Sequence, residues 1–238
     1  MPETTNRVIL IGHYGGDITH ACSGWTSTER ELTEDKRARL HKFLADLAKA
    51  GHHSPYEKST LHFLVNTDIA SHIHLLKHRI GVSINAESAR YKELKEDKYY
   101  LPSDWQDTRA NTWALDATTT KTWIQTLERY TEIGNRLYHD CVKDLTPVLG
   151  RKRAKESARF FKTYNSQIEA DVMFNWRSFA HFQSLRNSPD AQREIRIIAQ
   201  MMLLLVKNIP GNPFATTIES FGLDGAEFYN ELSDCRTV

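Results

Sequence analysis

Residues 77–91 read KHRIGVSINAESARY and gather many hydrogen-bond donors in a chain whose formal net charge is only +1. KHR (77–79) opens the stretch, eight residues follow, and SARY (88–91) closes it. Arginine binds phosphate oxygens in bidentate geometry, and lysine and serine add further donors, so the stretch suits an anion. Lysine and arginine are also common at helix C-termini, where the helix dipole favours them. The residues alone leave both interpretations open.

The segments around this stretch predict a helix-rich α+β fold. VILIGHY (8–14), LHFLVN (61–66) and IEADVMFNW (168–176) have the composition of strands. The composition does not shift along the chain and no repeat is present, so residues 1–238 are expected to form a single domain. Apolar periodicity predicts helices over 33–50, 68–78, 120–145, 155–161, 177–186 and 191–209. For the first of these helices, Thr33 is a plausible N-cap and Gly51 a stop.

Composition excludes several classes of protein. The 238 residues are 40% hydrophobic and 26% charged, as in a soluble globular protein, and a pI of about 7.8 argues against a surface built entirely for nucleic acid. MMLLLV (201–206) is too short to span a bilayer, and the N-terminus does not resemble a signal peptide. Cys22, Cys141 and Cys235 lack C-x-x-C spacing. A reduced, cytoplasmic protein without a structural metal is therefore expected.

Three further stretches are candidates for chemistry. GHHSPYEK (51–58) has a histidine pair that suits a ligand, although no carboxylate stands at a metal-binding spacing and a simple turn also explains it. In FNWRSFAHFQSLR (174–186), Arg177 and His181 would share a helix face, as they would on an ordinary surface helix. RKRAKESAR (151–159) is either a solvated face or a phosphate contact. There is no G-x-G-x-x-G fingerprint and no P-loop.

Taken together, these stretches resemble the flavin-dependent thymidylate synthases. The signature of that family is Arg-His-Arg, seven residues and then Ser-x-Arg-Tyr, which KHR…SARY closely resembles. GHHSPYEK resembles the family's His-x-Thr-Pro-Phe-Glu-His segment, and KESARFF…FNWRSFAHFQSLR resembles its C-terminal half. Several motifs in the family's order extend the likeness over most of the chain.

The resemblance implies a fold, a reaction and an assembly. It implies a compact α+β domain with a central mixed or antiparallel sheet, assembled as a homotetramer whose active sites are shared between subunits. It implies reductive methylation of dUMP to dTMP in the cytoplasm (the host's, if the chain is viral). The carbon donor would be 5,10-methylenetetrahydrofolate, and FAD reduced by NADPH and held without a Rossmann fold would supply the hydride. Neither a metal, a membrane nor a nucleic acid is implied.

The resemblance also assigns roles to individual residues. The residues implied to hold FAD are His52, Ser54, Lys77, His78, Arg79, Asn175, Arg177 and His181. The residues implied to bind the nucleotide are His74, Lys77, Glu87, Ser88, Ala89, Arg90, Arg159 and Arg186. Arg186 would lie against the uracil and favour negative charge at N3 and O4, which promotes substitution at C5. No cysteine has the Pro-Cys-His setting of the classical synthase, so the reaction needs a route without an enzyme nucleophile.

The chain departs from the family pattern around the nucleotide. Lys77 replaces an arginine, the gap before Ser88 holds eight residues rather than seven, and Gly81 is where the extra residue is expected. His74 stands for a glutamine, and Ala86 for an acidic residue. These departures motivate a second hypothesis, in which a different pyrimidine nucleotide is methylated or hydroxymethylated. A third is a degenerate family member that binds nucleotide without turnover, and a fourth is a non-catalytic nucleic-acid-binding protein.

Overall fold

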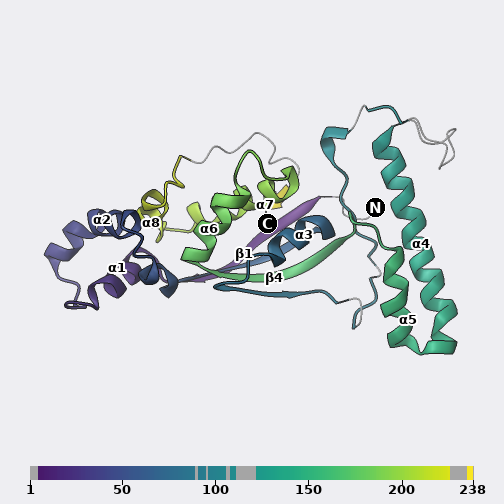
Figure 1. Cartoon of the computed structure of the whole chain (residues 1–238), viewed down its shortest axis with the longest axis horizontal. Coiled ribbons are helices and arrows are strands. Elements are labelled where there is room, and N and C mark those ends of the chain that lie inside the picture. The colour runs from purple at the N-terminus through teal and green to yellow at the C-terminus, as the bar shows by residue number, and fades with distance from the viewer. Residues whose placement is uncertain are drawn as a thin grey trace. The chain divides into compact units, whose positions relative to one another are not determined.

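A computed structural model describes residues 5–88, 91–94, 96–105, 108–110, 122–225 and 235–237 (Figure 1). Its elements confirm the expected α+β fold class. The strands are β1 (Asn6–Tyr14), β2 (Thr60–Asp68), β3 (Val82–Ala86), β4 (Gln167–Asn175) and β5 (Cys235–Thr237). The α-helices are α1 (Asp17–Trp25), α2 (Glu34–Lys49), α3 (Ile69–Leu76), α4 (Trp123–Leu149), α5 (Arg151–Ala158), α6 (Trp176–Arg186), α7 (Arg193–Lys207) and α8 (Ala215–Ser220). Short 3₁₀ helices are η1 (Ser54–Lys58), η2 (Ser103–Trp105) and η3 (Arg159–Phe161).

The strands form one sheet in the order β3-β4-β2-β1-β5. Strands β3 and β4 are antiparallel, because the backbone N–H of Asn175 donates to Gly81 at one end of the pair and that of Glu87 donates to Glu169 at the other. The sheet therefore agrees with the antiparallel arrangement, one of the two that the resemblance implied.

The chain divides into two compact units. The first comprises residues 1–6, 66–73 and 86–170, and the second comprises residues 7–65, 74–85 and 171–238. In the first unit, helices α4 and α5 pack side by side (Figure 1). In the second unit, α1, α2 and α8 pack together and α6 packs against α7.

Aromatic packing forms the core of the second unit. Phe63 of β2, Phe174 of β4 and Phe179 of α6 are fully buried, and the rings of Phe63 and Phe179 stack at 5.9 Å. Alternate residues of each strand supply this face, as the period-2 pattern predicts. Burying such rings stabilises each by roughly 1.5–3 kcal/mol. Trp176, the first residue of α6, stacks on Phe214 at 5.3 Å and fixes the start of that helix.

The helix ends follow local capping rules. Thr33 accepts a hydrogen bond from the backbone N–H of Lys36 at 3.3 Å, which confirms it as the N-cap of α2. Thr122 and Gln125 form a capping box at the start of α4, so this helix begins close to the predicted residue. Within the described parts of the chain, we find no helix with the length and apolar character that a membrane crossing requires.

Candidate active site

Six of the eight predicted flavin residues lie directly after α3, at the N-cap of α6 or on α6, in the second unit. Lys77, His78 and Arg79 follow α3 directly, because the helix ends at Leu76, two residues before the predicted end at residue 78. His181 and Arg186 lie on α6. All five line one cavity of about 270 Å³, together with Ile80, Val82, Ser178 and Leu185. Segments a hundred residues apart in sequence thus form a single cationic site.

The loop after α3 is fastened to the start of α6. Asn175 caps α6, since its side-chain oxygen accepts from the backbone N–H of Ser178 at 2.8 Å. The Ser178 hydroxyl donates to the carbonyl of Ile80 at 2.6 Å. The backbone N–H of Asn175 donates to the carbonyl of Gly81 at 3.0 Å. Asn175 therefore positions the cavity wall from the cap of α6.

Gly81 makes this close approach possible. Its φ is +65°, and a Cβ there would lie 2.2 Å from Nδ2 of Asn175 and 2.4 Å from Oγ of Ser178. Only glycine combines a left-handed backbone with that absence of a side chain. Gly81, where the sequence places the extra residue of the KHR…SARY gap, thus has a left-handed backbone conformation.

His78 and Arg186 interact directly within the cavity. Nε of Arg186 donates to Nε2 of His78 at 3.1 Å. Burial lowers the pKa of His78 to about 4, with further lowering from the charges of Arg186, His181 and His74. The His78 ring also packs edge-on against Phe182 at 5.0 Å. His78 is therefore a neutral hydrogen-bond acceptor at pH 7, beside a guanidinium that keeps its full charge.

A second cavity adjoins the first. It measures about 480 Å³ and shares Ile80, Ser178 and His181 with its neighbour. Its other lining residues are His53, Arg177, Ala180, Ser184, Phe221 and Leu223. Ligand pockets typically measure about 300–1,000 Å³, so the larger cavity by itself has the volume of a cofactor site.

Sequence reasoning placed a different histidine of the 51–58 segment at the cofactor. His53 lines the second cavity and lies 5.3 Å from Phe221, ring to ring. His52 and Ser54 are exposed on either side of it, and neither lines these two cavities. Nothing in GHHSPYEK distinguishes the two histidines; only the packing of Phe221 does.

Two predicted residues have partners that the sequence did not reveal. Arg177 forms an ion pair with Glu57, with Nη1 2.6 Å from Oε1. His74, on α3, donates from Nε2 to Oε1 of Gln192 at 3.1 Å. Both pairings join segments more than a hundred residues apart, which no local pattern could indicate. Glu57 and Gln192 thus set the orientation of a predicted flavin residue and a predicted nucleotide residue.

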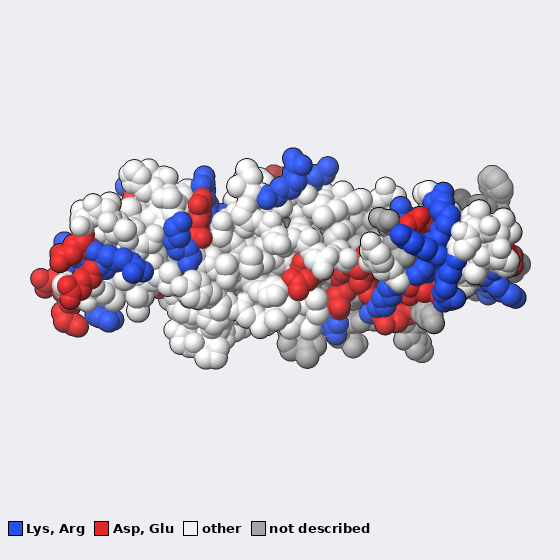
Figure 2. Space-filling view, turned by 90° about the horizontal axis from the view of Figure 1, so that it is seen from below, with Lys and Arg blue, Asp and Glu red and all other residues white. Residues whose placement is uncertain are grey.

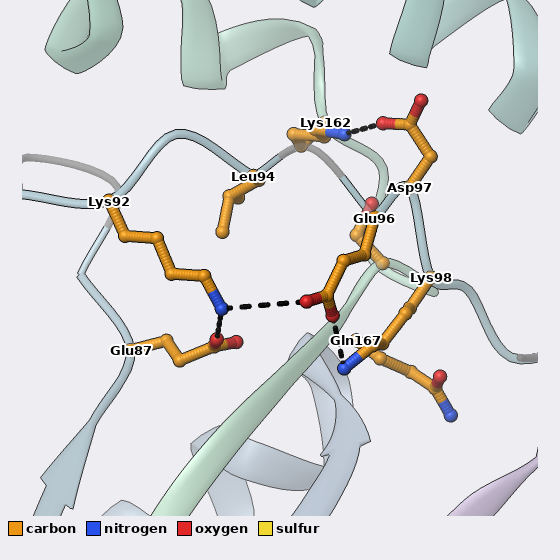
Figure 3. Close-up of a pocket in the computed structure, with 9 residues that line it drawn as sticks. Glu87, Lys92, Leu94, Glu96, Asp97, Lys98, Lys162 and Gln167 are labelled. Carbon is orange, nitrogen blue, oxygen red and sulfur yellow. Dashed lines mark hydrogen bonds and ion pairs between the residues drawn. The ribbon is translucent and has the colours of Figure 1, made fainter. Parts of the chain in front are cut away.

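The remaining nucleotide residues belong to the first unit. Glu87 and Ser88 follow β3, and Arg159 begins η3 and is exposed. Ala89 and Arg90 lie outside the described residues. The nearby cavity, between Glu87 and Lys162 (Figure 3), measures only about 20 Å³, which is room for one water molecule. Figure 3 shows Glu87, Lys92, Glu96 and Lys98 paired with one another rather than directed at an open cavity.

The site contains no metal cluster and no cysteine nucleophile in the part of the chain described. No group of three or more histidine, cysteine, aspartate or glutamate residues there could hold a metal ion. Cys22 and Cys141 are free thiols, and neither lines the two cavities. The cavities offer cations, imidazoles and hydroxyls, which is a donor set for anionic ligands.

Solved structures share this fold. The crystal structure of a UMP/dUMP methylase, PolB, from Streptomyces cacaoi bound with 5-Br dUMP matches with a TM-score of 0.73. The alignment covers 94% of this chain and 97% of that one, at 24% sequence identity. A likeness at this identity establishes the α+β fold.

Sequence comparison identifies the family. Flavin-dependent thymidylate synthase from Gluconobacter oxydans is 31% identical over 209 residues, which cover 84% of this chain and 65% of that protein. The chain thus spans slightly less than two thirds of that relative. The enzyme of the same name from Nitratidesulfovibrio vulgaris is 30% identical over 229 residues, covering 90% of this chain and 88% of that one. The model of the thymidylate synthase complementing protein family matches residues 10–210. The chain therefore belongs to the thymidylate synthase complementing protein family.

Proposed function

We propose that the protein is a flavin-dependent thymidylate synthase that methylates dUMP to dTMP. The carbon donor is 5,10-methylenetetrahydrofolate, and NADPH-reduced FAD is the hydride source. The observation that carries the proposal is the single cavity lined by Lys77, His78, Arg79, His181 and Arg186 in a chain of this family. The names of the curated relatives support the same activity.

The described residues fit a flavin cofactor. The two adjoining cavities share the wall formed by Ser178 and His181 and are rimmed by cations, so an extended diphosphate-containing ligand can span both. Arg177 is oriented by Glu57 at the edge of the larger cavity. Reduced FAD bound here would supply the hydride that completes the methyl group. NADPH would restore the reduced cofactor.

Arg186 is the residue assigned to substrate activation. Its guanidinium is held through Nε by neutral His78, which accepts a hydrogen bond without neutralising the charge. A cation fixed in this way stabilises negative charge that develops on the uracil ring as C5 attacks the carbon donor. Because the pKa of His78 is about 4, the imidazole orients Arg186 at neutral pH rather than donating a proton.

The chemistry does not require an enzyme thiolate. The thiols of Cys22 and Cys141 lie outside both cavities. Activation of the uracil by the charge of Arg186 takes the place of covalent attack at C6. The proposal therefore assigns the electrostatic role to Arg186 and no nucleophilic role to the protein.

A homotetramer with shared sites accounts for three surface features. In the second unit, Ile11, Tyr14 and Met173 expose 51%, 66% and 39% of their surface on β1 and β4, and Ile80 exposes 89% beside the cavity. Association with other subunits would cover these apolar side chains. His52 is exposed as well, which suits a residue that completes the site of another subunit. We propose this assembly as part of the function.

The flavin is tested first by the absorbance spectrum of the purified protein. A yellow protein with oxidised-flavin bands, bleached by NADPH under anaerobic conditions with dUMP present, supports the proposal. A colourless protein that takes up no added FAD overturns it. The spectrum reports on the cofactor independently of which pyrimidine is methylated.

A second candidate is methylation or hydroxymethylation of another pyrimidine nucleotide. The structural neighbour is a UMP/dUMP methylase, and His74 and Lys77 replace family residues near the predicted nucleotide. Parallel assays with UMP and dUMP distinguish the two. Flavin oxidation with UMP and none with dUMP would favour this candidate.

The charge distribution disfavours a nucleic-acid-binding protein. Arg151 pairs with Glu93, and Arg153 with Glu156, along the basic run. Toward both ends of the face shown in Figure 2, acidic and basic side chains lie next to one another. Nucleic-acid surfaces need cations whose charge is not already paired. Salt-sensitive DNA or RNA binding in a flavin-free protein would revive that hypothesis.

A further inference from the structure

Backbone hydrogen bonds join Ser88, a predicted nucleotide residue, to Tyr91 and Lys92, and these three residues are called the Ser88 turn. The carbonyl of Ser88 accepts from the backbone N–H groups of Tyr91 and Lys92 at 3.0 and 2.9 Å. Glu87 fastens the start of this turn to β4, because its backbone N–H donates to the Glu169 carbonyl at 2.9 Å and its Oε2 accepts from the Glu169 N–H at 3.1 Å. Its Oε1 also accepts from Nζ of Lys92 at 2.6 Å (Figure 3). Both carboxylate oxygens of Glu87 therefore already accept hydrogen bonds from within the protein.

Helix α5 fastens the other end of the turn. Nζ of Lys155 donates to the carbonyl of Tyr91 at 2.9 Å, and Lys155 is only 9% exposed. One helical turn earlier, Nη2 of Arg151 donates to Oε2 of Glu93 at 2.6 Å. Residues four apart on a helix lie on neighbouring turns, so both cations reach the same short segment. Arg159, the predicted nucleotide contact in η3, follows at the same interval.

We propose that Lys155, assisted by Arg151, is a positioning residue that holds Tyr91 and Lys92 of the Ser88 turn and thereby keeps Ser88 in position for the nucleotide. The inference rests on the proposed function for its ligand, a pyrimidine nucleoside monophosphate. It gives the basic run 151–159 a role inside the protein instead of at a nucleic acid. Lys155 and Arg151 would act through the Ser88 turn, without touching the nucleotide themselves.

The two contacts differ in weight. The Arg151 side chain is 62% exposed, and exposed ion pairs contribute little. Lys155 is only 9% exposed and its ammonium group donates to the Tyr91 carbonyl, so solvent screens this contact less than it screens the Arg151 ion pair. Lys155 is therefore the dominant contact.

The segment beyond the turn has anchors of its own. The Leu94 N–H donates to the Tyr138 hydroxyl at 3.2 Å. Asp97 accepts from Nζ of Lys162 at 2.7 Å (Figure 3) and from Nε2 of His139 at 3.0 Å. These contacts do not involve Lys155. A Lys155 variant therefore keeps the rest of this segment in place.

Amide hydrogen exchange of the full-length protein tests the clamp directly. In Lys155→Met, the amides of residues 91 and 92 should exchange about tenfold faster, while Lys155→Arg should retain most protection because it keeps a donor. Lys152→Met is the matched control, since Lys152 is an exposed lysine on the same helix. Unchanged exchange in Lys155→Met, or equal acceleration in Lys152→Met, would overturn the clamp.

Nucleotide binding to the same FAD-loaded variants tests its purpose. Lys155→Met should weaken dUMP binding about tenfold and raise KM more than it lowers kcat, with unchanged flavin content and with rescue by Lys155→Arg. Unchanged dUMP affinity together with accelerated exchange would overturn the nucleotide role. If the wild-type protein binds neither dUMP nor UMP, the proposed function fails, and amide exchange still decides whether the clamp exists.

Discussion

Nε of Arg186 donates a hydrogen bond of 3.1 Å to Nε2 of His78, although the two residues are 108 positions apart in the sequence. The bond requires a neutral imidazole, and burial holds the pKa of His78 at about 4. A buried acceptor orients the guanidinium while leaving its charge intact. This pair connects the KHR stretch to the C-terminal motif and provides the cation on which the proposed chemistry depends.

Arg186→Ala should lower kcat/KM for dTMP formation by about 10²–10³, because it removes the charge placed against the developing negative charge of the uracil. FAD content should persist, since the other cationic and imidazole groups of the two cavities remain. Turnover assays and absorbance of the purified variant measure the two effects. Arg37→Ala, at an arginine whose side chain is 53% exposed on α2, is the control. Undiminished turnover in Arg186→Ala would remove its assigned role.

The free energy of unfolding should fall as the pH drops below 6.5. The pKa values of His20 and His78 are lowered from 6.5 to about 3 and about 4 by burial. Between pH 6.5 and these values the unfolded chain binds protons that the folded chain does not, so each imidazole lowers stability by up to ~1.4 kcal/mol per pH unit. Urea unfolding across this range measures the slope.

His20→Gln should give a shallower pH slope, because it removes one of the histidines, His20, His72 and His78, whose pKa burial lowers. The His20 ring bridges Ser59 at 2.7 Å and Thr217 at 3.0 Å, so the variant is also expected to be less stable at neutral pH. The slope and the neutral-pH stability are separate readouts. An identical slope in variant and wild type would contradict the assignment to His20.

Gly81→Ala should destabilise the protein by more than about 2 kcal/mol, because the new Cβ would collide with Asn175 and Ser178 in addition to straining a φ of +65°. Gly51→Ala is a matched control, since Gly51 has a φ of +74° with nothing within 4 Å of the added Cβ. Thermal or urea unfolding compares them. Equal losses in the two variants would show that contact with the α6 cap is unimportant.

Co-expression of His52→Ala and Arg186→Ala chains tests the proposal that subunits of a tetramer share their active sites. Each variant alone should have little activity, because one lacks a predicted flavin contact and the other lacks the uracil cation. Mixed tetramers should recover measurable dTMP formation, since some sites then receive an intact contribution from both chains. The mixture is assayed beside each variant at equal total protein. If the mixture forms no more dTMP than the two variants assayed separately, then His52 and Arg186 of one chain serve the same site, or at least one of them serves no site.

Much of the fold follows from local pattern. The predicted strands 8–14, 61–66 and 168–176 correspond to β1, β2 and β4, and the predicted helix over 33–50 corresponds to α2. These segments have regular apolar periods and clear capping residues, which local rules can identify. The α-helices α1 and α8 and the strand β3 were not predicted. β3 lies inside the KHR…SARY stretch, where its VSINA sequence alternates too briefly to stand out.

The site was predictable in its residue types and less so in its geometry. The order of the motifs identified Lys77, His78, Arg79 and Arg186 as candidate site residues, and the structure places them around one cavity. The choice of His53 as a cavity residue depends on packing against the C-terminal part of the chain, which no local pattern indicates. The partners Glu57 and Gln192 likewise depend on tertiary contacts.

Product analysis of an anaerobic reaction tests the central claim most directly. The FAD-loaded protein is supplied with NADPH, 5,10-methylenetetrahydrofolate and either dUMP or UMP, and the nucleotides are separated afterwards. We predict dTMP from dUMP, with no product when FAD, NADPH or the folate is omitted. Oxidation of reduced flavin without dTMP, or a methylated product from UMP alone, would contradict the assignment of this protein as a dUMP methylase.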